Sequence, residues 1–357
     1  MCKNTITGFY SAGGKFPNAA RLATTNYAGP PGKAGAAVQA GAGVRRRHCA
    51  LEQSGALADD SKIMFRIGID LGGTKIEGIV LDAQGKELFR KRVETEREKG
   101  YAHILNRIQA VHGELAANIS QAPHTFGIGT PGVVSPRTGL LKNSNTVCMN
   151  GQPVKADLEK LLGRKIEIQN DANCFAMAEA LHGAGKGKQL VFGVIMGTGC
   201  GGGLVHHGEV RTGPQGIAGE WGHMCIDPKG PRCYCGQLGC TEVFISGGGL
   251  QNRYAEQFGI KKTFREIEQD YHAGEPNAVA FMKIFFRHFG RAVANLIDIL
   301  DPDVVVLGGG VSKFDAVYTE GVAEVQRFVF NDKLETPIVK HQIGDSAGVI
   351  GAALIGV

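Results

Sequence analysis

The stretch that decides the fold runs from Phe65 to Leu81 and reads FRIGIDLGGTKIEGIVL. Residues 65–70 and 76–81 are apolar runs rich in isoleucine, as expected of buried strands. Residues 71–75 lie between them and contain two adjacent glycines, which favour a tight turn. The stretch therefore predicts two strands joined by a glycine-rich turn.

The same plan occurs again further along the chain. Residues 190–196 predict a strand, 197–203 read GTGCGGG and predict a glycine-rich turn, and 204–207 predict a second strand. A unit that occurs twice predicts two related lobes facing each other, in an α/β protein. Between the two units, residues 103–118 predict an amphipathic helix with apolar side chains on one face.

The glycine-rich turns predict a phosphate-binding function. Gly197, Gly199 and Gly202 match G-x-G-x-x-G, but a dinucleotide fingerprint must open a helix, and this loop opens a strand. Both turns are instead typical of hairpin loops that offer backbone N–H groups to phosphate oxygens. A third turn, 308–310, follows an expected strand at 304–307, where a base or ribose of a nucleotide can approach the backbone.

A cysteine-rich stretch predicts a metal site. Cys233, Cys235 and Cys240 lie within eighteen residues of His223, and three thiolates with one imidazole suit tetrahedral zinc. Buried free cysteines and disulfides are the alternatives, and the spacing favours structural zinc. A closed zinc site does not need the flanking Glu220 and Glu242, so we expect these carboxylates to hold something else.

Composition and charge exclude two classes of partner. The chain of 357 residues has 39 basic and 34 acidic residues, and its first 62 residues hold eight of the basic and three of the acidic ones. The remainder is electrically balanced, which argues against a nucleic-acid partner. No apolar run approaches the ~18–20 residues that span a membrane. We expect a cytoplasmic protein without a membrane partner.

The first 63 residues predict a disordered leader. They are rich in glycine and alanine, and they show neither a helical nor a strand period. They lack the apolar core of a secretory signal, although their arginines leave a transit peptide open. Met64 directly precedes the first expected strand, so we prefer a start codon assigned too far upstream.

From Met64 to Val357 the chain resembles the ROK sugar kinases of the actin-like ATPase superfamily. The motifs that carry the resemblance are Asp-Leu-Gly-Gly-Thr-Lys (70–75), Gly-Thr-Pro-Gly (129–132), Asn-Asp-Ala-Asn (170–173), Gly-Thr-Gly-Cys-Gly-Gly-Gly (197–203), Glu-Trp-Gly-His (220–223), the cysteine cluster and Leu-Gly-Gly-Gly (307–310). The resemblance implies a two-lobed ribonuclease H-like fold with a ligand cleft and a homodimeric assembly. The small lobe would comprise 64–182 plus about 340–357, and the large lobe, with the zinc loop, 183–339.

The resemblance also implies roles for individual residues. Asp171 would be the general base for the sugar hydroxyl, although a helix N-cap role also fits its position. Asp70 would organise Mg²⁺ through water. ATP and its phosphates would lie along Gly72, Gly73, Thr74, Lys75, Gly197, Thr198, Gly199, Gly308, Gly309 and Gly310. For Lys75 a surface salt bridge is the alternative.

The sugar would be held by amide, carboxylate and imidazole groups, namely Asn145, Asn170, Asp171, Glu220, His223 and Glu242. His223 can serve twice, with one ring nitrogen on zinc and the other on a sugar hydroxyl.

The function implied is ATP-dependent phosphorylation of a hexose at its terminal hydroxymethyl oxygen. Asn145 with Asn150, and Cys233-Tyr234-Cys235, look most like fructokinases, so fructose is our first choice, with mannose and glucose as side substrates. His223-Met224 looks like N-acetylglucosamine kinases, and that activity or glucokinase is the alternative. The family also contains sugar-responsive transcriptional regulators, but residues 1–62 show no helix-turn-helix pattern.

Overall fold

The computed structural model describes residues 65–357, so the predicted leader of residues 1–63 lies outside the described residues. The first half of the described chain contains β1 (Phe65–Leu71), β2 (Lys75–Asp82), β3 (Glu87–Glu94), α1 (Tyr101–Asn118), β4 (His124–Thr130), β5 (Val133–Val134), β6 (Leu141–Lys142), α2 (Val154–Leu162), β7 (Glu167–Asn170) and α3 (Asp171–His182). The second half contains β8 (Leu190–Met196), β9 (Cys200–His206), β10 (Glu209–Val210), α4 (Thr241–Ile245), α5 (Gly247–Phe258), α6 (Phe264–His272), α7 (Pro276–Leu300), β11 (Val304–Gly308), α8 (Glu320–Phe328), β12 (Ile338–Lys340) and α9 (Ala347–Leu354).

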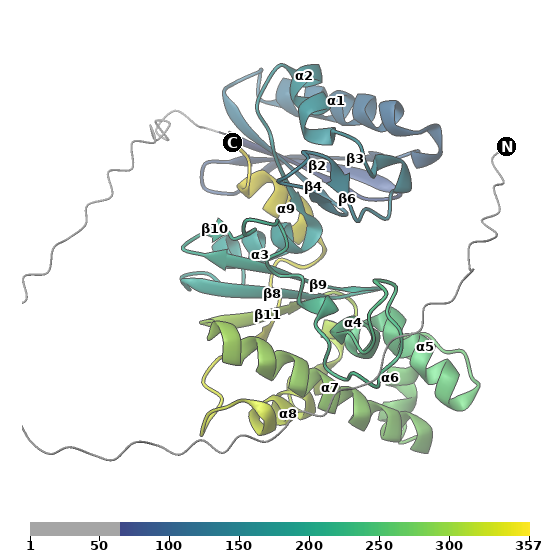
Figure 1. The fold of residues 1–357 in the computed structure, drawn as a ribbon. Coiled ribbons are helices and arrows are strands. Elements are labelled where there is room, and N and C mark those ends of the chain that lie inside the picture. Colours follow the sequence, from purple (N-terminus) through teal and green to yellow (C-terminus); the bar gives the residue numbers. More distant parts are fainter. Residues whose placement is uncertain (1–64) are drawn as a thin grey trace, which may run out of the picture. The chain divides into compact units, whose positions relative to one another are not determined.

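Two five-stranded sheets repeat one topology, as the duplicated sequence plan predicts. The first sheet has the order β3-β2-β1-β4-β7 and the second has the order β10-β9-β8-β11-β12. In each sheet a three-stranded antiparallel meander is followed by two parallel strands. The parallel additions need crossover helices, and these are α1 and α2 for the first sheet and α4 to α8 for the second (Figure 1).

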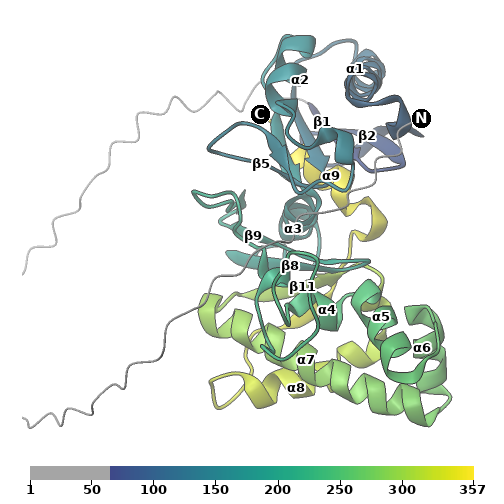
Figure 2. The same cartoon turned by 45° about the vertical axis from the view of Figure 1, so that its right-hand side comes forward.

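Successive side chains of the central strands point to opposite faces of the second sheet. Both faces are buried. Phe192 and Val194 of β8 face the phenylalanine-rich helix α7, whose buried residues include Phe285 and Phe289. Val191 belongs to a separate cluster that the sheet forms with α3. Figure 2 shows α4 to α8 gathered on one side of this sheet and α3 on the other.

Helices α3 and α9 pack against each other, α3 also against the second sheet and α9 against the first (Figure 1). This packing requires small residues where backbones meet. A Cβ on Gly351 of α9 would lie 1.8 Å from the carbonyl oxygen of Cys174, and one on Gly68 of β1 would lie 2.3 Å from the backbone nitrogen of Ala353. Side chains at these glycines would push the helices away from each other and from the sheet.

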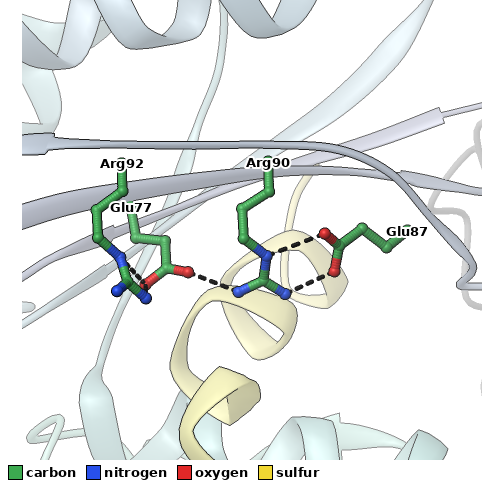
Figure 3. Close-up of polar contacts among 4 residues, drawn as sticks. All are labelled: Glu77, Glu87, Arg90 and Arg92. Carbon is green, nitrogen blue, oxygen red and sulfur yellow. Dashed lines mark hydrogen bonds and ion pairs between the residues drawn. The ribbon is translucent and has the colours of Figure 1, made fainter.

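The hairpin of β2 and β3 carries a chain of ion pairs on its surface (Figure 3). Glu77 of β2 accepts hydrogen bonds from Arg90 at 2.5 Å and from Arg92 at 2.6 Å, and Arg90 also contacts Glu87 at 2.6 Å. Glu77 pairs with Asp70 in the register of β1 and β2. The two arginines therefore balance the charge of the carboxylate that lies opposite Asp70 in the register of β1 and β2.

Among residues 65–357, none of the helices combines the length and the hydropathy that crossing a membrane would require.

Candidate active site

Asp171 begins helix α3 directly after strand β7, at the carboxyl end of the first sheet. The N-cap of α3 is Asn170, whose Oδ1 accepts a 2.7 Å hydrogen bond from the Asn173 N–H. Asp171 instead accepts a 2.8 Å hydrogen bond from the N–H of Ala172, its neighbour. The capping role suggested for Asp171 is thus wrong, because the preceding asparagine fills it and leaves the aspartate inside the first turn.

Two cavities meet at Asp171. One of about 470 Å³ opens toward β9 and the cysteine-rich loop, and one of about 210 Å³ opens toward β11 and α9. Asp171 and Ile195 line both cavities. A carboxylate in this position can reach one ligand from each side.

The larger cavity, called the sugar cavity below, brings together all the residues predicted to bind sugar: Asn145, Asn170, Asp171, Glu220, His223 and Glu242. They come from segments as far apart as the 143–150 loop and the start of α4. The predicted phosphate loop of Gly197, Thr198 and Gly199 lines the same cavity. Gly132, Asn143 and Tyr234, for which no role was predicted, also line this cavity.

The loop that presents Asn145 is held by the side chain of Asn150. The Asn150 amide accepts a 2.8 Å hydrogen bond from the Ser144 N–H and donates one of 2.8 Å to the Ser144 carbonyl. The Ser144 hydroxyl in turn accepts a 3.1 Å hydrogen bond from the Thr146 N–H. Asn145 is exposed between these fixed neighbours. The Asn150 side chain therefore fixes the backbone from which Asn145 projects.

The predicted phosphate loop is anchored to the start of α5 and to Glu242. The N–H of Gly247 donates a 2.7 Å hydrogen bond to the Gly197 carbonyl. Glu242 Oε2 accepts a 2.9 Å hydrogen bond from the Cys200 N–H, and a Cβ on Gly199 would lie 2.7 Å from that oxygen. Glycine at 199 lets the carboxylate approach the loop.

The smaller cavity, called the nucleotide cavity below, is lined by Gly309 and Gly310 of the predicted nucleotide turn. Its other walls include Phe175, Lys313, His341 and Asp345, for which no role was predicted. Gly308 does not reach this cavity, since it ends β11 against Phe175, with a hypothetical Cβ 2.5 Å from the ring.

The first glycine turn lies apart from both cavities. Gly72, Gly73, Thr74 and Lys75 line neither of them. Thr74 and Lys75 are exposed, and Lys75 enters no ion pair with another residue of the described chain. Gly73 lies nearest to the sugar side, because a Cβ there would approach the Asn145 Oδ1 at 3.8 Å. The geometry therefore leaves the phosphate role of this turn as a prediction.

Asp70 and Asp171 are neighbouring carboxyl groups, and the charge of Asp171 acts on Asp70. Burial and the neighbouring Asp171 and Glu77 raise the pKa of Asp70 to about 6. Burial also raises the pKa of Asp171, although its side chain is exposed to the cavities. Asp70 lies beneath α9, where a Cβ on Gly348 would be 2.9 Å from its Oδ2. A partly buried carboxyl group whose ionisation is disfavoured by a neighbouring carboxylate fits a hard divalent cation such as Mg²⁺, which would favour the charged form.

Glu220 adds a third carboxyl group to the sugar cavity. Burial raises its pKa, the nearby His223 opposes that shift, and Asp171 and Glu242 add to it. The sugar cavity thus concentrates hydrogen-bond acceptors, which suits a ligand with many hydroxyl groups.

The predicted zinc ligands converge in space. One donor atom from each of His223, Cys233, Cys235 and Cys240 lies within 4.8 Å of every other. The Cys235 and Cys240 sulfurs are 3.6 Å apart, and the Cys233 sulfur is 3.7 Å from His223 Nδ1. A tetrahedral zinc with Zn–S bonds of about 2.3 Å separates its sulfurs by roughly 3.8 Å. The four donors therefore fit zinc.

The family model described as the ROK family matches residues 66–356. The chain belongs to the ROK family. An N-acetyl-D-glucosamine kinase of Pasteurella multocida (strain Pm70) is 38% identical over 304 residues, which cover 82% of this chain and 99% of that protein. An N-acetyl-D-glucosamine kinase of Vibrio atlanticus (strain LGP32) is 36% identical over 300 residues, covering 81% of this chain and 99% of that protein.

Solved structures of ROK proteins share the fold. A ROK hexokinase from Thermus thermophilus matches with a TM-score of 0.76 and 32% identity, covering 82% of this chain and 98% of that one. A ROK family glucokinase from Streptomyces griseus, solved with glucose and AMPPNP, matches with a TM-score of 0.65 and 29% identity, covering 82% of this chain and 99% of that one. The fold is the two-lobed actin-like ATPase fold that the sequence motifs predict.

Proposed function

We propose that this ROK protein transfers the γ-phosphoryl group of ATP to the terminal hydroxymethyl oxygen of N-acetyl-D-glucosamine. That it is an enzyme of the sugar-kinase class follows from its family and relatives. The choice of sugar rests on the relatives in Pasteurella and Vibrio, which carry the name of that kinase. The names of these relatives do not support fructose, which was the first choice from the sequence. N-Acetyl-D-glucosamine, one of the alternatives, therefore replaces it.

The position of Asp171 between the two cavities is the observation that carries the proposal. In the proposed reaction Asp171 accepts the proton of the sugar hydroxyl while the hydroxyl oxygen forms a bond to the γ-phosphorus and the bond to ADP breaks. A carboxylate whose pKa is raised is a better base at neutral pH than an ordinary aspartate.

Asn145, Glu220, His223 and Glu242 would orient the sugar hydroxyls in this reaction. Gly309 and Gly310 would accept the nucleotide against their backbone, and the anchored loop of 197–199, which lies beside Gly309, would approach the phosphates. Positioning of this kind supplies most of what phosphoryl transfer requires. The residues that line the two cavities come from segments of both sheets. We therefore expect the cleft to close on the sugar and exclude water.

Two metal ions fit this assignment. Asp70 would hold Mg²⁺, which neutralises phosphate charge when bound. His223, Cys233, Cys235 and Cys240 would hold zinc, which fixes the loop without taking part in the chemistry. We further expect a homodimer, which light scattering on the purified protein can check.

A coupled ADP-release assay with Mg-ATP tests the proposal. Fructose, mannose, glucose and N-acetyl-D-glucosamine should be compared at several concentrations. We expect the highest kcat/KM with N-acetyl-D-glucosamine. A higher value with fructose or glucose would reinstate fructokinase or glucokinase. Sugar binding without ADP release from any of the four would contradict a kinase.

A further inference from the structure

The hydroxyl group of Tyr234 lies at Nε2 of His223, whereas Nδ1 of the same ring lies near the sulfur of Cys233. The Tyr234 hydroxyl oxygen lies 3.1 Å from Nε2 of His223, and the two rings meet edge to face at 5.2 Å. Tyr234 lines the sugar cavity together with Glu220 and Glu242, and yet 83% of its surface is exposed. Few contacts besides the histidine hold this side chain.

The zinc ligands decide which nitrogen of His223 carries the proton. Nδ1 lies 3.7 Å from the sulfur of Cys233 and belongs to the four-donor cluster. A nitrogen that gives its lone pair to a metal leaves the proton on the other ring nitrogen. Nε2 therefore donates, and the Tyr234 hydroxyl oxygen accepts. This is the hydrogen bond that the proposed function assigns to a hydroxyl of the sugar.

We infer that Tyr234 is a placeholder: its hydroxyl accepts the His223 Nε2–H bond in the empty site, and its ring rotates away when the sugar binds. The inference rests on the proposed function, because it needs a sugar hydroxyl at His223. Tyr234 thereby sets sugar affinity through His223.

The backbone around Tyr234 restricts the motion to the side chain. Cys233 donates a 2.8 Å hydrogen bond to the Gln237 carbonyl, and Gly236 donates one of 3.0 Å to the Cys233 carbonyl. Arg232 and Leu238 form an antiparallel bridge around the same turn. With zinc bound, the cysteines on both sides of Tyr234 are fixed as well. Rotation about the side-chain bonds of Tyr234 is therefore the motion that can free Nε2.

Competition for one donor has a measurable consequence. The site is ready for sugar only in the fraction of molecules whose tyrosine has left His223, and the apparent sugar affinity falls by that fraction. Removing the hydroxyl oxygen alone should remove the competition. A tyrosine that contacts the bound sugar through its hydroxyl would have the opposite effect, because the variant would then lose a favourable bond.

The test is Tyr234→Phe in the zinc-loaded enzyme, with zinc content measured for each preparation. Sugar Kd can be followed through the fluorescence of Trp221, the only tryptophan in the chain, which lies in the 3-10 turn that carries His223. We expect N-acetyl-D-glucosamine to bind about three- to tenfold more tightly, with the ATP KM within twofold of wild type. Tyr271→Phe is the matched control, since its hydroxyl bonds to Glu320 away from both cavities. It should leave Kd unchanged.

Weaker or unchanged sugar binding in Tyr234→Phe would overturn the placeholder role. That result is separable from a failure of the proposed function. If the wild-type enzyme releases ADP with N-acetyl-D-glucosamine and Tyr234→Phe binds it no more tightly, only the inference fails. If the wild-type enzyme neither binds nor phosphorylates that sugar, the proposed function fails first.

Discussion

The carboxylate of Glu179 accepts a 2.9 Å hydrogen bond from the backbone N–H of Ile343, across 164 positions of sequence. Glu179 is fully buried near the end of α3, and it also accepts hydrogen bonds from the Gln342 N–H at 3.1 Å and the Ala184 N–H at 2.9 Å. These residues lie in the segments that follow α3 and β12, where the chain passes between the two sheets. One carboxylate thus joins, through hydrogen bonds, the two segments in which the chain passes between the sheets.

Glu179→Gln should destabilise the protein by about 2–4 kcal/mol. The amide replaces a charged acceptor by a weaker one and turns an N–H₂ donor toward backbone donors in a buried site. Urea unfolding measures the loss. Glu114→Gln is the control, because Glu114 forms an exposed ion pair with Lys91 and should change stability by less than about 0.5 kcal/mol. Equal stability of the two variants would contradict this role of Glu179.

Asp70→Asn should stabilise the Mg²⁺-free protein at pH 8 while abolishing phosphoryl transfer. The pKa of Asp70 is raised from 3.8 to about 6, so its contribution to stability is present at low pH and is lost as pH rises through about 6. The variant should gain about 1–3 kcal/mol at pH 8 and almost nothing near pH 3.5, below the unfolded pKa of 3.8. Thermal unfolding in Mg²⁺-free buffer measures both values. A gain that is equal at the two pH values would show that burial does not oppose ionisation of Asp70.

Removal of zinc should damage sugar binding before nucleotide binding. The cluster holds the loop that carries His223, while the nucleotide cavity is lined by residues from α3, β8 and positions 309–348. Chelation, or Cys233→Ser, should raise the sugar KM at least tenfold and lower the Tm, with the ATP KM within twofold. Cys148→Ser, outside the cluster, should change neither. An unchanged sugar KM in a zinc-free preparation would refute this division.

Acid should destabilise the first sheet through His112. Burial, then His124 and Arg164, lower the pKa of His112 to about 4, and the His112 and His124 Nε2 atoms are 3.2 Å apart. The unfolded chain therefore binds more protons between pH 6.5 and about 4, and stability falls as the pH drops through that range. His112→Gln should reduce this loss by about 1–3 kcal/mol, whereas His207→Gln, in an exposed turn, should not. Parallel pH profiles for wild type and His112→Gln would argue against the effect.

Much of the fold could be predicted because strand and helix periods are local. The helix expected at 103–118 forms at Tyr101–Asn118 and buries Ile104, Leu105, Ile108, Val111 and Leu115. The strand expected to reach residue 207 ends at His206, because His207 has a φ of 52° and begins the turn to β10. Nothing in the local sequence indicates that this histidine takes left-handed backbone angles. The boundary between strand and turn could therefore not be predicted.

The part of the site that is built from motif residues could be predicted from the sequence. The part that forms only when distant helices and loops pack together could not. Asn170 ends strand β7 and Asp171 follows it directly, so their place at the carboxyl end of the strand follows from the strand alone. Tyr234 could have been found, because two ligands of one metal on either side restrict where it lies. Phe175 and His341 gave no signal, since they meet at the nucleotide cavity only after α3 and the 341–346 segment pack together.

Asp171→Asn tests the central claim, that the carboxylate between the two cavities is the base of a sugar kinase. The amide keeps the shape of the side chain but cannot take the hydroxyl proton. Asp157→Asn is the control, because its partner Tyr101 lies away from both cavities.

The decisive measurement is kcat for N-acetyl-D-glucosamine together with its Kd in both variants. The account predicts that Asp171→Asn loses about 10²–10⁴-fold in kcat, with Kd within about fivefold of wild type and Asp157→Asn unchanged. A kcat in Asp171→Asn within a few fold of wild type would contradict it.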